Sequence, residues 1–395
     1  MIFSDKIYRL RKKEKMSQEE FAELFNVSRQ AVQKWESGAS LPELAKIIEI
    51  SKYFGISIDS SISGDNRRML CEHMPSAELQ AYFEDIPEWE FYAAAMMDEY
   101  KQAVDEGLEI EQYKMLFEAI SRLPQNRIKK EFGDVIQKII LTAPIKSGYK
   151  YIEPSHLSEI KDLRKELSSE DGKIVNLKEN LYGAWMGRIC GCMLGKTVEG
   201  IKSDELTRFL KETNNFPLNR YINRTDLDKV NLSEYSYDFL HRIYADEIDC
   251  MPVDDDTNYV VLAQLIFDEY GEEFTPDDVA SAWLRYQPKD AYCTAERVAF
   301  CNFVKGYRPP QSAVHKNPYR EWIGAQIRGD YWGYINPGNP ENAAEMAWRD
   351  ASISHVKNGI YGEMFVSGMI ASAAQSFPDV TQKLAIGSFF AEKGT

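Results

Sequence analysis

The stretch SQEEFAELFNVSRQAVQKWESG, residues 17–38, decides the fold of the amino-terminal part of the chain. Ser17 followed three residues later by Glu20 is a capping box, and Ser28 is a second N-cap candidate. Gly38 is a residue type at which helices commonly end. The pattern therefore predicts two short helices joined by a tight turn, with apolar residues at helical spacing that can fill one small core: Phe21, Leu24, Phe25, Val27, Val32 and Trp35.

Residues 1–64, on both sides of this stretch, fit a small five-helix unit. The predicted helices cover Asp5–Lys13, Gln18–Phe25, Arg29–Glu36 and Pro42–Phe54, with a fifth after Ser57. The segment from Lys6 to Lys15 holds six bases and one acid, whereas the whole chain has 47 basic and 62 acidic residues and a net charge of −15. The chain as a whole therefore disfavours nonspecific binding to nucleic acid, and a DNA contact is expected only at this basic end.

This unit resembles the Cro and phage-repressor class of helix-turn-helix domains. The resemblance implies double-stranded DNA as the partner, with the second helix of the motif in the major groove and half-sites at the spacing of a homodimer. Carried over by position, Arg29, Gln30 and Lys34 face bases with Gln33 beside them, and Gln18 and Ser28 meet phosphates. Two other interpretations stay open, a small bundle that binds nothing and a protein-binding form of the same fold.

The rest of the chain carries no sign of a membrane protein or a disulfide scaffold. Apolar runs such as Phe365–Ala374 are shorter than a bilayer helix, and the first fifteen residues are too charged for a signal peptide. Six cysteines show no C-x-x-C pair and no zinc spacing. We therefore expect a cytoplasmic protein, bacterial or phage-like, with no membrane partner.

Residues 65–175 read as a polar helical extension or linker without a catalytic pattern, and alternating strand patterns are scarce along all 395 residues. The predicted fold class is therefore all-α. Residues 176–395 form a third region, in which Gly183, Gly187, Gly191 and Gly195 make one stripe on a helix. We attribute the first two of these glycines to the close approach of another helix backbone.

Three features of this third region suggest chemistry. Glu199 lies on a tight loop directly after the glycine helix. Asp254, Asp255 and Asp256 precede an apolar helix, and three adjacent carboxylates repel one another unless a divalent cation such as Mg²⁺ or Mn²⁺ binds them. A solvated helix cap is the alternative for this triplet. His355 precedes a glycine-bounded turn that opens another apolar helix.

In this order, the three features resemble the ADP-ribosylglycohydrolase family, whose members remove ADP-ribose from protein side chains. The resemblance covers residues 176–376 and implies an all-helical domain with two Mg²⁺ or Mn²⁺ ions in a cleft. It also implies an ADP-ribosylated protein or an ADP-ribose-like molecule as the partner. Carried over by position, the metal ligands are Asp255 and Asp256 with Asp254 beside them, the catalytic residue is the carboxylate of Glu199, acting as a general base, and the substrate-binding residues are His355, Asp330 and Gly338.

One departure from the family pattern affects the expected activity. The family has a second Asp-x-Asp-Thr motif well after the position of His355, whereas Asp379 is the single aspartate after Ala371 here. We therefore expect a domain truncated at its carboxyl end, an incomplete metal site, and weak or no turnover. The possible functions are a DNA-binding hydrolase, a transcriptional regulator that senses an ADP-ribose-type ligand without turnover, and an inactive fragment.

Overall fold

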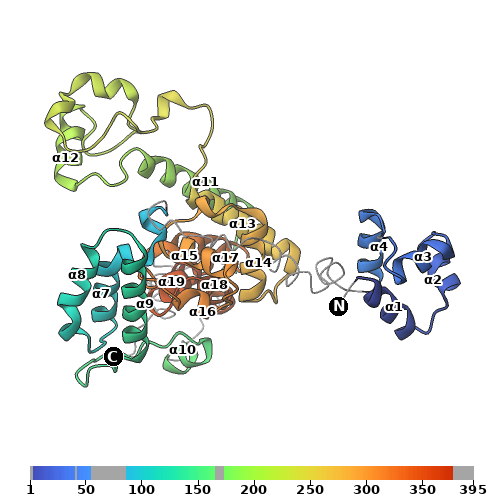
Figure 1. Ribbon diagram of the computed structural model, residues 1–395. Coiled ribbons are helices and arrows are strands. Elements are labelled where there is room, and N and C mark those ends of the chain that lie inside the picture. Colours follow the sequence, from blue (N-terminus) through green and yellow to red (C-terminus); the bar gives the residue numbers. More distant parts are fainter. Residues whose placement is uncertain (1–2, 41, 55–85, 165–172, 377–395) are drawn as a thin grey trace. The chain divides into compact units, whose positions relative to one another are not determined.

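Figure 1 shows a computed structural model of the chain, which describes residues 3–40, 42–54, 86–164 and 173–376. Most of these residues lie in helices and very few in strands, which confirms the predicted all-α class. The strands among them are β1 (Lys173–Ile174) and β2 (Gln375–Ser376), which pair antiparallel. The chain divides into two compact units, Met1–Ala81 and Tyr82–Thr395. The predicted boundary at 64/65 lies outside the described residues, and the one at 175/176 falls within the second unit.

The first unit contains four of the five predicted helices. They are α1 (Phe3–Lys13), α2 (Gln18–Leu24), α3 (Arg29–Glu36) and α4 (Leu44–Phe54). The predicted fifth helix lies outside the described residues. The capping box is present, because Ser17 Oγ accepts a hydrogen bond from Glu20 N at 3.1 Å and Ser17 N donates to Glu20 Oε2 at 2.6 Å. Most of the predicted core is also present, with Phe21, Phe25 and Val32 fully buried, but Leu24 is 39% exposed and does not belong to it.

The second unit begins with the extension and continues into the larger helical region. The extension contains η2 (Glu88–Glu90), η3 (Tyr92–Ala95), α7 (Met96–Asp105), η4 (Glu111–Tyr113), α8 (Lys114–Ser121), α9 (Arg127–Thr142) and α10 (Leu157–Leu163). The larger region contains α11 (Leu177–Lys196), α12 (Ser203–Glu212), η5 (Arg224–Lys229), η6 (Leu232–Glu234), η7 (Ala245–Glu247), α13 (Asp255–Tyr270), α14 (Pro276–Tyr286), η8 (Lys289–Ala291), α15 (Thr294–Val304), α16 (Gln311–Val314), η9 (Ile323–Arg328), α17 (Asp330–Tyr334), α18 (Pro340–Ala351) and α19 (Asn358–Ala373).

A buried ion cluster joins the extension to the larger region. Arg320 Nη1 donates to Glu99 Oε1 of α7 at 2.8 Å, and Arg320 also pairs with Glu106. Nearby, Trp348 Nε1 of α18 donates to Ser155 O at 2.8 Å. Because buried charges of this kind are stable only when they are paired, the extension is an integral part of the second unit rather than a separate linker.

Aromatic packing forms the main core of the second unit. Trp283 of α14 stacks on Tyr292 with ring centroids 4.4 Å apart, and Phe274 stacks on Trp332 of α17 at 4.7 Å. Residues around α12 have a hydrophobic cluster of their own, centred on Phe209. This division leaves the end of α11 and the start of α13 next to the main core, where the candidate site lies.

Three local expectations need correction. Among the described residues, no atom lies within 4 Å of a Cβ placed on any of the four glycines of α11, so no helix backbone approaches Gly183 or Gly187. The prolines and glycines spread between aromatic residues over 302–339 predict a long ordered loop, whereas the structure has the short helices α16, η9 and α17 there. Helix α19 begins at Asn358, before the glycine-bounded turn ends, and Gly359 lets it pass close to the ring of His355.

Candidate functional site

A cleft of about 640 Å³ lies where four segments of the second unit meet. The end of α11 and the turn after it contribute one wall, and the first turns of α13 and α15 contribute the opposite walls. The start of η9 closes it with Trp322 and Gly324. The ionisable groups in its lining are Cys192, Lys196, Glu199, Asp254, Asp255, Asp256, Tyr259, Cys293 and Glu296. The predicted catalytic glutamate and the aspartate triplet therefore line one cleft.

Asp254 is the N-cap of α13, as the alternative interpretation of the triplet requires. Its carboxylate accepts a hydrogen bond from Asp256 N at 3.0 Å, and Lys196 Nζ lies 2.5 Å from its Oδ2. Burial alone would raise the pKa of Asp254, but the ion pair with Lys196 holds that pKa below its ordinary value. Asp254 is therefore an ionised cap with its own counter-ion.

Asp255 and Asp256 have no comparable partner among the described residues. Burial and the negative charges of Asp254 and Asp256 raise the pKa of Asp255. The cation nearest to the Asp256 carboxylate is Arg188, at 3.9 Å. Carboxylates without a close counter-ion are the donors that a hard divalent cation prefers, so the chemistry of these two residues fits the expected Mg²⁺ or Mn²⁺.

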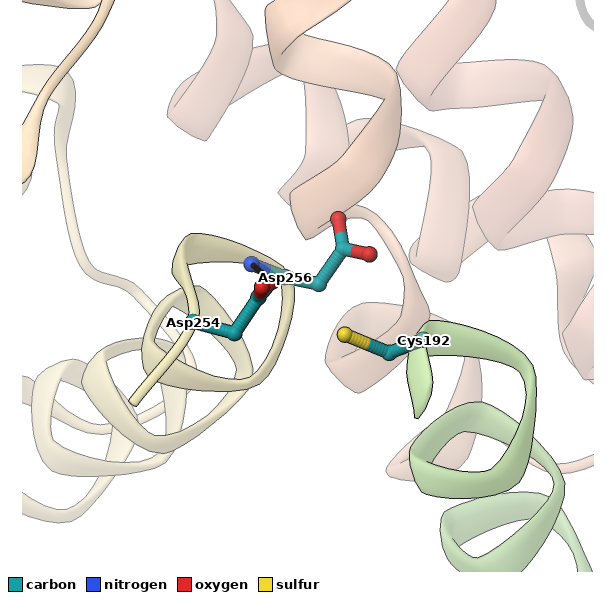
Figure 2. A group of neighbouring side chains, drawn as sticks. All are labelled: Cys192, Asp254 and Asp256. Carbon is teal, nitrogen blue, oxygen red and sulfur yellow. Dashed lines mark hydrogen bonds between the residues drawn. The ribbon is translucent and has the colours of Figure 1, made fainter. Parts of the chain in front are cut away.

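Cys192 lies beside the triplet, which the sequence did not indicate. Figure 2 shows its side chain projecting from α11 toward the start of α13. Its Sγ and one carboxylate oxygen each of Asp254 and Asp256 all lie within 4.8 Å of one another. Burial, followed by hydrogen bonding to Asp254, raises the pKa of the Cys192 thiol far above its ordinary value, so the group is a neutral thiol.

Glu296 is a second residue of the cleft that the sequence reasoning missed. It lies in the first turn of α15 and is 2% exposed. Burial is the main cause that raises its pKa to about 7; Arg328 opposes this rise, and nearby Asp255 and Asp350 contribute to it. In the sequence, an acid in a first helical turn is ordinary, so nothing marked this one as buried.

A buried cluster of charged groups lies behind Glu296. Arg328 Nε donates to Asp350 Oδ2 at 2.7 Å, whereas its contacts to Glu296 Oε1 and Glu363 Oε2 are longer, 3.4 and 3.7 Å. One arginine thus faces three carboxylates. Burial, followed by the charge of Asp350, raises the pKa of Glu363 far above its ordinary value. The cluster therefore retains protons next to the cleft.

His355 belongs to this cluster and is not among the residues that line the cleft. Its ring is 1% exposed, Nδ1 lies 2.8 Å from Ser354 Oγ, and Nε2 lies 4.0 Å from Glu296 Oε1. Burial, helped by the charge of Arg328, lowers the pKa of His355 far below its ordinary value. Its predicted contact with substrate stays a prediction.

The other two predicted substrate residues lie elsewhere in the second unit. Asp330 Oδ2 forms an ion pair with Arg188 Nη1 at 2.9 Å. Asp330 lines a separate cavity of about 270 Å³ between α11, α17 and α19. Gly338 has a φ of +77° and contacts the β1–β2 pair through Ile174 and Gln375. The structure therefore does not bring these two residues to the cleft.

In the first unit, the residues predicted to face bases share one surface. Arg29, Gln30, Gln33 and Lys34 are all exposed on α3, while Val32 and Trp35 are buried. Arg29 Nε lies 2.9 Å from Glu19 Oε1, with both side chains more than half exposed. Such a surface pair contributes little stability, so DNA can compete for Arg29.

The two residues predicted to meet phosphates have structural partners. Ser28 Oγ caps α3 by accepting from Ala31 N at 3.1 Å. Gln18 Nε2 donates to Glu36 Oε2 at 2.7 Å, and Arg11 Nε donates to the other oxygen of Glu36 at 2.6 Å. Their phosphate contacts stay predictions.

These features define a chain that joins a helix-turn-helix DNA-binding domain to a helical, carboxylate-lined hydrolase-like domain. The ADP-ribosylglycohydrolase family model matches residues 174–392, more than half of the chain, so the chain belongs to the ADP-ribosylglycohydrolase family. The helix-turn-helix family model matches residues 7–60. Both predicted resemblances are thereby confirmed.

A curated relative agrees with the assignment of the first unit. The chain is 36% identical over 86 residues to the HTH-type transcriptional activator BcrR of Enterococcus faecalis. The match covers 22% of this chain and 42% of the relative, so the chain spans less than half of that protein's length. No solved structure matches the chain. Within the described residues, every helix is too short or too polar to cross a membrane.

Proposed function

We propose that this protein is a DNA-binding regulator whose second unit binds an ADP-ribosylated side chain and hydrolyses the bond between ribose and that side chain. The observation that carries the proposal is the single cleft lined by Glu199, Glu296 and the aspartate triplet. A hydrolase of glycosidic bonds needs one carboxylate to take a proton from water and a second group to protonate the leaving atom. We assign these two roles to Glu199 and Glu296 of this cleft.

The two glutamates differ in the way these roles require. Glu199 is exposed on the turn after α11, where its carboxylate can take the proton of an attacking water. Glu296 is buried with a pKa of about 7, so it holds a proton near neutral pH and can give it to the departing oxygen or nitrogen. A divalent cation held by Asp255 and Asp256 would supply a Lewis acid that orients the ribose hydroxyls.

The second candidate function is a regulator that senses an ADP-ribose-type ligand without turnover. It is favoured by the ion pair of Lys196 with Asp254, which removes one carboxylate from the set that could hold metal ions. It is also favoured by the helix-turn-helix unit on the same chain. In this case the ligand binds in the same cleft, but the water is not activated.

Calorimetry with ADP-ribose and a release assay on ADP-ribosyl-arginine and ADP-ribosyl-serine peptides, both with Mn²⁺, test the proposal. We expect binding and slow release of ADP-ribose. Glu199→Gln should keep binding, because the amide is nearly isosteric, and slow release by about 100-fold or more. Glu179→Gln, an exposed change at the other end of α11, is the control.

The outcomes separate the candidates. Release that depends on Glu199 supports the hydrolase. Binding without release by the wild-type chain supports the sensor. Absence of both rejects an ADP-ribose-type ligand for this cleft.

A further inference from the structure

A second cavity of the second unit lies between the extension and the larger helical region. Helices η2 and η3 line one side, α15 lines the other, and residues 316–319 also contribute. All of its lining residues differ from those of the cleft, although both cavities touch α15. Its volume is about 50 Å³, which is room for a few water molecules or one small oxyanion but not for a whole nucleotide. We call this cavity the extension groove.

Two cationic side chains of α15 line the extension groove. Arg297, Cys301 and Lys305 follow one another at intervals of four residues, so they share one face of the helix. The Cα atoms of Arg297 and Lys305 are about 12 Å apart along the helix axis at the usual rise per residue. Two side chains of this length can span that distance and contact the same small anion.

Neither of these cations has a counter-ion among the described residues. No ion pair or side-chain hydrogen bond that these residues form involves Arg297 or Lys305, and Arg297 Nε is buried without a partner. The Arg297 guanidinium lies 5.7 Å from the ring centroid of Trp89, which is a cation–π distance. Buried donors in folded proteins are nearly always paired, so an unpaired donor at a cavity indicates an acceptor that binds there.

The other charged side chains of the extension groove are already compensated. Glu90 pairs with Lys289, and Lys316 pairs with Asp134 of α9. Burial raises the pKa of the Cys301 thiol, so this group stays neutral between the two cations of α15. The uncompensated charge of the groove is therefore that of two cations, which matches the charge of one dianion.

We propose that the extension groove is a binding site for a phosphate group, held by Arg297 and Lys305 and separate from the cleft. A guanidinium can donate two parallel hydrogen bonds to phosphate oxygens, and an ammonium group adds a further donor. A phosphate monoester carries close to two negative charges at neutral pH, whereas a carboxylate carries one, so the charge balance favours phosphate.

Trp89 extends this site toward solvent. Its side chain is 61% exposed, and its ring lies against the Arg297 guanidinium. An aromatic ring in this position can cover an organic group attached to the bound phosphate. The inference goes beyond the proposed function, because no residue that lines the cleft takes part in it.

Calorimetric titration of the full chain with inorganic phosphate, compared with chloride at equal ionic strength, tests the inference. We expect saturable binding of phosphate. Arg297→Met removes the guanidinium but keeps an apolar stem against Trp89, and it should weaken binding by about 10-fold or more, because charge-assisted hydrogen bonds are lost. Lys305→Met should weaken binding by a smaller factor. Lys202→Met, an exposed lysine ahead of α12, is the matched control and should bind phosphate as the wild type does.

Alkylation of the cysteines, followed by peptide mass spectrometry, locates the bound phosphate. Phosphate should slow the modification of Cys301, which lines the groove, and leave that of the exposed Cys250 unchanged. Titrations with adenosine monophosphate and ribose monophosphate distinguish the sources of the phosphate group. Tighter binding than that of inorganic phosphate identifies a phosphate monoester as the ligand, and equal binding identifies free phosphate.

Either of two results would overturn the inference. One is a wild-type chain that binds phosphate no better than chloride. The other is phosphate binding that both Arg297→Met and Lys305→Met leave unchanged, or that does not protect Cys301. If circular dichroism shows that Arg297→Met is unfolded, Lys305→Met carries the test, because Lys305 is exposed at the end of α15. Failure of ADP-ribose to bind would contradict the proposed function alone, since the groove and the cleft are tested with different ligands.

Discussion

Replacing Glu296 by glutamine is expected to stabilise the second unit at pH 8 and to leave its stability nearly unchanged at pH 5. The side chain is 2% exposed, and burial is the largest cause of its raised pKa. The nearest cation, Arg328, is engaged more closely by Asp350. At pH 8 the wild type therefore buries a carboxylate that is poorly compensated, whereas the glutamine variant buries a neutral amide.

The size of the effect follows from the pKa. A rise from 4.5 to about 7 corresponds to roughly 3 kcal/mol at about 1.4 kcal/mol for each unit. Between these two values the folded chain keeps the proton and the unfolded chain loses it, so the stability of the wild type falls as pH rises through this window. Above about pH 7 the loss is complete. The glutamine variant has no ionisable group at this position, so its stability does not fall in this pH window.

Urea unfolding of both proteins at pH 5 and pH 8 measures this difference. Tryptophan fluorescence reports the second unit mainly through Trp283 and Trp332, which are fully buried, and the first unit only through Trp35. Glu273→Gln is the control, because the Glu273 side chain is 89% exposed. A gain for Glu296→Gln below about 1 kcal/mol at pH 8, or an equal gain at pH 5, would refute the view that Glu296 is a buried proton carrier.

The parts of the fold that the sequence predicts well are those set by near neighbours in the chain. The Ser17–Glu20 capping box depends on residues within one helical turn and is present as predicted. The start of α14, where Thr275 caps the helix and Pro276 takes its first position, is equally local. Cap and turn chemistry involves only these few residues, so it can be read directly from their spacing.

The parts of the site that the sequence could not predict depend on contacts across long separations. Glu296 is buried because Gly324 brings η9 against it, since a Cβ on Gly324 would lie 2.0 Å from Glu296 Oε1. Lys196 meets Asp254 only when the end of α11 reaches the start of α13. The interpretation of Gly183 failed for the same reason, because a smooth helix face does not reveal what packs against it.

Two further sets of substitutions test the DNA-binding surface of α3 and the ion pairs that join the extension to the larger helical region. Arg29→Ala should cost about 1 to 3 kcal/mol on the preferred DNA site and little on random duplex, whereas Lys13→Ala should weaken both equally and lower the salt dependence. Fluorescence anisotropy at several salt concentrations measures this, and equal loss on both duplexes for Arg29→Ala would exclude base readout. Arg320→Met leaves Glu99, whose side chain is 1% exposed, without its counter-ion, so urea unfolding should show a loss of about 3 kcal/mol. Adding Glu99→Gln should restore part of that stability, because the carboxylate that has lost its counter-ion is then neutral, while Glu106 keeps Lys357 at 3.4 Å. A double variant as unstable as the single one would show that the ion pair with Glu99 is not what joins the extension to the core.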